Sequence, residues 1–227
     1  GYIQKREFPK YTLMFMLGGM QGVLGWYMVK SGLVDNPHVS QYRLTAHLIA
    51  AFLIYAYMFW VALTLLFPSE STDNHPWYGK TLALTTLISI TIISGGFVAG
   101  LKAGKINNAF PKMGESWIPP DLLTLEPTWK NFFENMTTVQ FDHRVLAITT
   151  FVLIVTYWVK LRKTSLPTGM RRGVNALFHT AILQVALGIF TLLLVVPTIL
   201  AASHQAVAML LFTVAIYLCH GFRRSST

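Results

Sequence analysis

Apolar residues gather along this chain in six windows of about 20 residues or slightly more, separated by more polar stretches. A helix of that length crosses the hydrocarbon core of a bilayer, where backbone groups must be hydrogen-bonded within their own segment. Proline, serine and threonine residues mark the boundaries between windows. The pattern therefore predicts an all-α integral membrane protein with six transmembrane helices, at residues 11–29, 41–66, 79–101, 138–160, 173–196 and 198–222.

The composition agrees with a membrane protein, since 53% of the side chains are hydrophobic and 12% are charged. The net charge of +9 does not indicate a nucleic-acid partner, because the basic residues are mostly confined to segments between the apolar windows. The expected surroundings are a lipid bilayer. The single cysteine, Cys219, excludes an internal disulfide and a Cys-x-x-Cys motif. The chain begins at Gly1 without a recognisable targeting segment, so we expect a processed product or a piece of a longer protein.

Lysine and arginine residues predict the orientation of the helices. They gather before the first window, between the fourth and fifth windows, and after the sixth. With six spans, all three clusters fall on one side of the membrane, which the positive-inside rule assigns to the inner side. Both termini are therefore expected on the inner side. Residues 102–136 form a long outer loop in which basic and acidic residues nearly balance.

Two parts of the chain resemble each other. GMQGVLGW matches AILQVALGI through Gln21 and Gln184, and the helix that follows each segment then aligns His47 with His204. Membrane proteins are often built from such repeats. The repeat divides the chain into residues 1–78 and 79–227.

On this division, residues 79–227 form a complete four-helix bundle and residues 1–78 form the second half of a homologous bundle. Two further helices are then expected before residue 1.

Three of the seven histidines are expected at one depth, namely His47, His143 and His204. Each follows a likely helix cap by about five to seven residues, which corresponds to about 8–10 Å along a helix. The caps expected for these helices are Ser40, Thr138 and Thr198. Ionisable groups at such a depth are rare and usually functional. The other histidines are expected in loops or near the inner helix ends: His38, His75, His179 and His220.

His143 and His204 lie on helices that run in the same direction and are predicted to be diagonal in the bundle. The two imidazoles would then face each other across its core. Zinc would require further ligands, whereas a haem held by two imidazoles requires only this pair. Histidines that are hydrogen-bonded within the core are the alternative. Glycines that would make room for a flat ring are Gly96, Gly100, Gly104 and Gly188, although this spacing is also common in helix packing.

Charged residues lie beside these histidines. Arg144, or Arg43 one turn before His47, is a candidate to pair with a haem propionate. Asp142 would orient the imidazole N–H of a neighbouring histidine or pair with Arg144. An ion pair between Asp142 and Arg144 without a role in binding is the alternative.

Five segments carry a resemblance to a known family, namely GMQGVLGWYMVKSGL, VSQYRLTAHL, GGFVAGLKAGKINNAFPKMGESWIP, TTVQFDHRVLA and AASHQAVAML. They resemble the haem A synthase family in its mitochondrial form, and the resemblance covers nearly the whole chain. The resemblance implies two similar four-helix bundles, each with a histidine pair. It implies oxidation of a ring methyl group of haem O to the formyl group of haem A, for use by cytochrome c oxidase. This sequence has no pair of outer-loop cysteines, which fits the mitochondrial and proteobacterial class.

The resemblance also implies a role for each deep histidine. His143 and His204 match the pair that holds a haem b cofactor, through which electrons from the substrate would leave. His47 matches one ligand of the substrate haem O and is therefore the candidate catalytic residue. Its partner histidine and a nearby glutamate would lie on a preceding helix that this sequence does not contain. The resemblance therefore assigns the reaction to the parent protein.

The expected location is the mitochondrial inner membrane, with both termini in the matrix; a proteobacterial inner membrane is the alternative. Expected partners are haem O, haem A, haem O synthase, oxidase assembly factors and a second copy of the chain. Two other functions remain open from the residues alone. One is a b-type haem protein that relays electrons across the membrane, which requires histidine pairs at both faces. The other is a non-catalytic haem carrier or assembly factor.

Overall fold

The computed structural model describes residues 7–33, 39–68 and 75–223, although not the side chains of residues 31–33. These residues contain six long helices and no β-strand. The long helices are α1 (Phe8–Leu33), α2 (Gln41–Leu66), α3 (Tyr78–Gly100), α5 (Met136–Leu161), α6 (Thr168–Leu193) and α7 (Thr198–Arg223). Each is long and apolar enough to cross a membrane, which confirms the predicted fold class. Three short helical turns lie between α3 and α5: η2 (Ala103–Lys105), η3 (Thr128–Lys130) and α4 (Asn131–Glu134).

Four helices begin earlier than the sequence predicted, namely α1 and α3 by three residues and one residue, and α5 and α6 by two and five residues. The expected cap of α5, Thr138, is wrong, because Asn135 occupies the N-cap position. Its Oδ1 atom accepts hydrogen bonds from the backbone N–H groups of Thr137 and Thr138, at 2.9 and 3.2 Å. An amide oxygen at this position satisfies donors that have no partner within the helix. Helix α6 begins at Thr168, directly after Pro167, rather than at residue 173.

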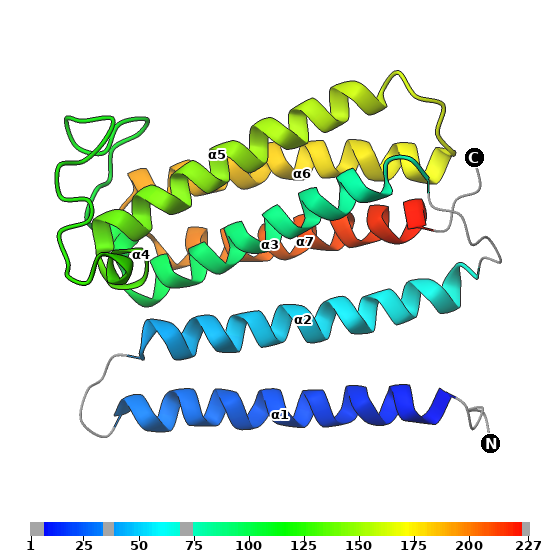
Figure 1. The fold of residues 1–227 in the computed structure, drawn as a ribbon, viewed down its shortest axis with the longest axis horizontal. Coiled ribbons are helices and arrows are strands. Elements are labelled where there is room, and N and C mark those ends of the chain that lie inside the picture. Colours follow the sequence, from blue (N-terminus) through cyan, green and yellow to red (C-terminus); the bar gives the residue numbers. More distant parts are fainter. Residues whose placement is uncertain (1–6, 34–38, 69–74, 224–227) are drawn as a thin grey trace.

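Helices α3, α5, α6 and α7 form a four-helix bundle, and α2 packs against α3 and α7 (Figure 1). Helix α1 packs on α2. Within the bundle, α5 contacts α3 and α6, whereas α7 contacts α6 and α3, so α5 and α7 are diagonal as predicted. The start of α1 and the end of α7 lie at one end of the molecule, and the segment between α3 and α5 lies at the other. We call the second end the loop end; which side of a membrane it faces stays a prediction.

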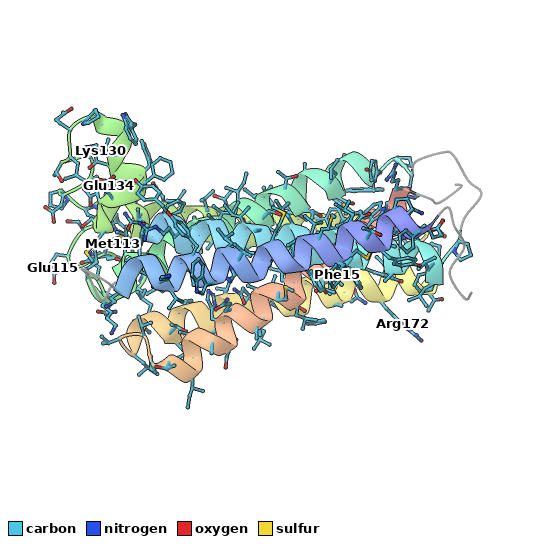
Figure 2. All side chains as sticks on the ribbon, turned by 90° about the horizontal axis from the view of Figure 1, so that it is seen from below. Phe15, Met113, Glu115, Lys130, Glu134 and Arg172 are labelled. Atoms are coloured by element: carbon cyan, nitrogen blue, oxygen red, sulfur yellow. The ribbon has the colours of Figure 1, made fainter. Side chains whose placement is uncertain are left out.

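The hydrophobic core lies in the half of the bundle away from the loop end. Its members come from the first halves of α3 and α6, the second halves of α5 and α7, and the last turns of α2. The most deeply buried large side chains include Ile88, Leu161, Leu177, Leu218 and Phe222. Helix α1 stays exposed by comparison, as Phe15 shows with 83% of its surface accessible (Figure 2). The loop-end half of the bundle contributes no residue to this core cluster.

Candidate functional site

The three histidines predicted to be deep all lie at the loop end. They are His47 on α2, His143 on α5 and His204 on α7, and all three helices begin at this end (Figure 1). Each histidine follows the first residue of its helix by six or seven positions. With a rise of 1.5 Å per residue, their depth is about 9–10 Å. The structure therefore places the three histidines at similar positions along helices that begin at the same end of the molecule. A common depth in the membrane stays a prediction.

Each of these imidazoles lies against a glycine of the long helix that precedes it. The pairs are Gly25 with His47, Gly95 with His143, and Gly188 with His204. A Cβ atom on these glycines would lie 3.0, 3.2 and 3.0 Å from the Cε1 atom of the ring, respectively. Any larger residue would therefore push the ring aside. The same pairing occurs three times, in α1–α2, α3–α5 and α6–α7.

The glycine series on α3 does not make room for a ring. A Cβ atom on Gly96 would lie 3.1 Å from Oγ1 of Thr45, and one on Gly100 would lie 2.6 Å from the Cα atom of Gln41, both on α2. Gly104 faces the segment between α6 and α7 instead. The interpretation that these glycines make room for a ring is therefore wrong, and the alternative of helix packing holds for Gly96 and Gly100, which lie against α2.

Glutamine side chains meet two of the histidines in the same way. The Nε2 atom of Gln21 lies 3.4 Å from Nε2 of His47, and that of Gln184 lies 3.3 Å from Nε2 of His204. In both pairs, the histidine Nδ1 atom is buried without a hydrogen-bond partner. The α1–α2 and α6–α7 hairpins thus repeat each other in contacts as well as in sequence.

His143 has a different neighbour. The Oγ atom of Ser94, on α3, lies 2.8 Å from His143 Nδ1 and also donates to the Thr91 carbonyl, at 2.8 Å. His143 and His204 lie on diagonal helices that both begin at the loop end.

Sequence reasoning missed Ser94, Gly25 and Gly95 as histidine contacts. It also treated Gln21 and Gln184 as markers of a repeat rather than as side chains of the site. The available signal was the four-residue interval from each glutamine to a glycine, which places both on one helix face. Ser94 gave no comparable signal, because hydroxyl residues recur along all of α3.

Buried polar atoms without partners mark the same half of the bundle. They are Gln21 Oε1, Thr45 Oγ1, His47 Nδ1, Gln140 Oε1, Arg144 Nε, Gln184 Oε1, Thr191 Oγ1 and His204 Nδ1. Buried polar atoms without hydrogen-bond partners are uncommon in folded proteins. Together with the histidines on diagonal helices, the glycine contacts and the lack of a core cluster here, they fit a large, flat, mostly apolar group that imidazole nitrogens could ligate. The described residues contain no group of three or more histidine, cysteine or acidic side chains that could hold a metal ion.

Arg144 anchors the loop. Its guanidinium donates to the carbonyl oxygens of Asn107, Ala109 and Lys112, at 2.7, 2.9 and 3.0 Å. Within the described residues, no ion pair joins it to Asp142, so that alternative is wrong. The pairing of Arg144 with a propionate stays a prediction, and the bonds to the loop are its observed contacts.

Arg43 lies on α2, one turn before His47. Its guanidinium carbon is 5.5 Å from the centre of the Tyr27 ring on α1, in a cation–π contact. A pairing of Arg43 with a propionate also stays a prediction.

The opposite end of the molecule does not repeat this arrangement. His220 is buried, with Nε2 3.2 Å from the Thr64 hydroxyl and its ring edge-on to Trp60. His179 is exposed on the outer surface of α6. These two histidines therefore do not form a second pair at the end of the molecule opposite the loop end. An electron relay across the membrane, which requires such a pair at each face, is not favoured.

Comparison with known proteins identifies relatives along nearly the whole chain. The family model COX15-CtaA, described as cytochrome oxidase assembly protein, matches residues 1–216. The chain is 53% identical over 219 residues to heme A synthase of Nitrosospira multiformis, which covers 95% of this chain and 62% of the relative. It is 43% identical to heme A synthase COX15 of Arabidopsis thaliana, with 100% of this chain and 52% of the relative covered.

The human protein of the same name is 47% identical, with 90% of this chain and 52% of the relative covered. The chain thus spans between about half and three fifths of the length of these relatives.

Proposed function

Since the chain belongs to the COX15-CtaA family of cytochrome oxidase assembly proteins, we propose that it supplies haem-binding helices of a haem A synthase. This enzyme is a membrane oxidoreductase that converts a methyl group of haem O to the formyl group of haem A. Relatives named heme A synthase, in bacteria and in eukaryotes, support this assignment. The observation that supports it in the structure is the pair of histidines, His143 and His204, six or seven residues after the starts of diagonal helices.

The proposed cofactor is haem b, held between His143 and His204. A haem there would supply one-electron redox chemistry at its iron. His143 and His204 would hold it from two long helices, and Gly95 and Gly188 let these helices approach their neighbours closely. The packed core beyond this site excludes water from the rest of the bundle.

His47 is the proposed ligand of the substrate haem O. It has a glutamine and a glycine in the same places as His204, which supports an equivalent role in the first hairpin. Neither α1 nor α2 contains an acidic side chain. We therefore propose that any side chain that removes a proton from the substrate comes from outside these two helices.

The proposed location is the inner membrane of a mitochondrion or of a proteobacterium, with the loop end on the outer side. The basic clusters at the opposite end support this orientation. Haem O and haem A are the proposed substrate and product. Haem O synthase, oxidase assembly factors and a second copy of the chain are proposed protein partners.

The test is an absorption spectrum of the purified chain in mild detergent, oxidised and reduced, with chemical typing of the extracted haem. We expect a low-spin b-type spectrum that disappears in His204→Ala and in His143→Ala. The matched control is His179→Ala, because that imidazole is exposed on α6. A folded, helical sample without haem, or equal spectra in all variants, would contradict the assignment. Haem A in the extract of cells that make haem O would establish the reaction.

A further inference from the structure

We propose that Ser94 is a positioning residue for His143: it fixes the tautomer of the imidazole, so that Nε2 faces the haem iron with a free lone pair. This inference rests on the proposed function, because it assigns iron to the pair His143 and His204. Ser94 itself would not touch the haem. Its role is to hold the ring by its other nitrogen.

The hydrogen bonds around Ser94 determine which nitrogen of His143 carries the proton. The hydroxyl group has one hydrogen, which it donates to the Thr91 carbonyl at 2.8 Å. Its Oγ atom, 2.8 Å from His143 Nδ1, can therefore only accept from that nitrogen. Nε2 is consequently unprotonated, as an iron ligand must be.

The other two deep histidines are held differently. An amide N–H group from Gln184 points at Nε2 of His204, the nitrogen that would bind iron, and Nδ1 has no partner. Gln21 and His47 show the same pattern. Among the three, only His143 has a hydroxyl oxygen at hydrogen-bond distance from its Nδ1 atom in the described residues. The two ligands of the proposed haem b therefore differ in this support from Ser94.

A hydrogen bond from Nδ1–H makes the imidazole a stronger electron donor, which favours ferric over ferrous iron. Loss of such an outer partner typically lowers metal affinity by about 10- to 100-fold. If a tenfold loss falls on the ferric form alone, the midpoint potential of the one-electron couple rises by about 59 mV. Ser94→Ala removes the acceptor and is expected to shift the potential in this positive direction. Ser94→Cys keeps a similar volume with a weaker acceptor, so we expect a smaller shift of the same sign.

Ser89→Ala is the matched control. Ser89 lies on the same helix, is partly buried like Ser94, and donates to the carbonyl four residues earlier, Thr85, at 2.8 Å. It has no histidine neighbour among its hydrogen bonds. A substitution there removes one hydroxyl from α3 without changing the support of His143. We expect its haem potential and affinity to match those of the unmodified chain.

The experiment titrates the purified chain with ferric protoporphyrin IX and then measures the midpoint potential of the bound haem by spectroelectrochemistry. Circular dichroism verifies that each variant is folded. A positive shift in both Ser94 variants, with an unchanged Ser89→Ala, supports the proposal. Equal potentials and affinities in Ser94→Ala, Ser94→Cys and the unmodified chain would overturn it, while leaving the haem site intact. If the unmodified chain binds no haem, the proposed function fails first and this inference fails with it.

Discussion

Arg144 offers a direct test of how the outer loop is held. Its guanidinium joins the start of α5 to three carbonyl groups between residues 107 and 112. Arg144→Met keeps a long apolar side chain but removes all of its N–H donors. We expect the loop to open far more often in this variant, while the helical bundle stays folded, because the core lies at the opposite end of the molecule.

The size of the effect follows from the three bonds. A hydrogen bond to a charged group contributes about 1.5–3 kcal/mol, but such bonds from one side chain are not additive. Arg144 is only half-buried, so water can replace some of the hydrogen bonds that the carbonyl groups lose in the variant. We therefore expect the free energy of loop opening to fall by about 2–4 kcal/mol, that is, a factor of about 30 to 1,000 in the open population.

Hydrogen exchange followed by mass spectrometry measures this population. The amides of Met113 and Ser116 are suitable reporters, since each donates to the carbonyl group of the other residue. Their exchange should accelerate in Arg144→Met. Arg162→Met is the matched control, because Arg162 lies at the other end of α5, over the Trp158 ring.

Unchanged exchange in the loop would refute the reasoning. A weaker affinity for haem together with unchanged exchange would show that Arg144 serves a propionate and not the loop.

Three further changes test the site and its frame. Gly188→Ala places a Cβ atom 3.0 Å from Cε1 of His204, so we expect haem affinity to fall by about tenfold or more. Gly22→Ala is the control, because a Cβ atom there meets no atom within 4 Å and should leave haem affinity unchanged. Asn135→Ala removes the cap of α5 and should lower the unfolding free energy by about 1–2 kcal/mol in thermal or denaturant unfolding; no loss would show that the cap is not needed. Burial lowers the pKa of His75, outside the helices, so the folded protein prefers the neutral ring. The stability contributed by His75 is present above its unfolded pKa of about 6.5 and falls as the pH drops below that value. His75→Asn should therefore weaken the dependence of the melting temperature on pH in this range. An unchanged pH dependence would contradict this role of His75.

The helices and the depth of the histidines were predictable from the sequence because both depend on local geometry. An apolar run of about 20 residues forms a helix in lipid whatever surrounds it. The rise per residue is constant, so the distance from a helix start to His47, His143 or His204 can be counted. The diagonal placement of α5 and α7 followed from their common direction within an antiparallel four-helix bundle. These inferences required no knowledge of which side chains touch.

The sequence was misleading where the answer depended on rotation about a helix axis. Gly95 and Gly96 are adjacent, but successive residues of an α-helix differ by about 100° in direction. Gly95 therefore faces His143, whereas Gly96 faces Thr45 on α2. Periodicity could not decide between them, since α3 is apolar on all sides.

Long-range contacts were a second limit. Arg144 was expected near a haem propionate because it follows His143, yet it bonds to carbonyl groups more than 30 residues away in sequence. No sequence pattern in the loop predicts that its backbone carbonyl groups accept hydrogen bonds from Arg144.

By itself, the sequence determined six apolar helices, the common end at which three histidines lie, and the family to which the chain belongs, because these follow from helix length, helix rise and motif identity. Only the tertiary structure decided that Ser94 supports His143, that glutamines meet the other two histidines, and that Arg144 holds the loop. Those contacts join helices whose relative rotation is set by the packing of many side chains at once, and no single stretch of the chain contains that information.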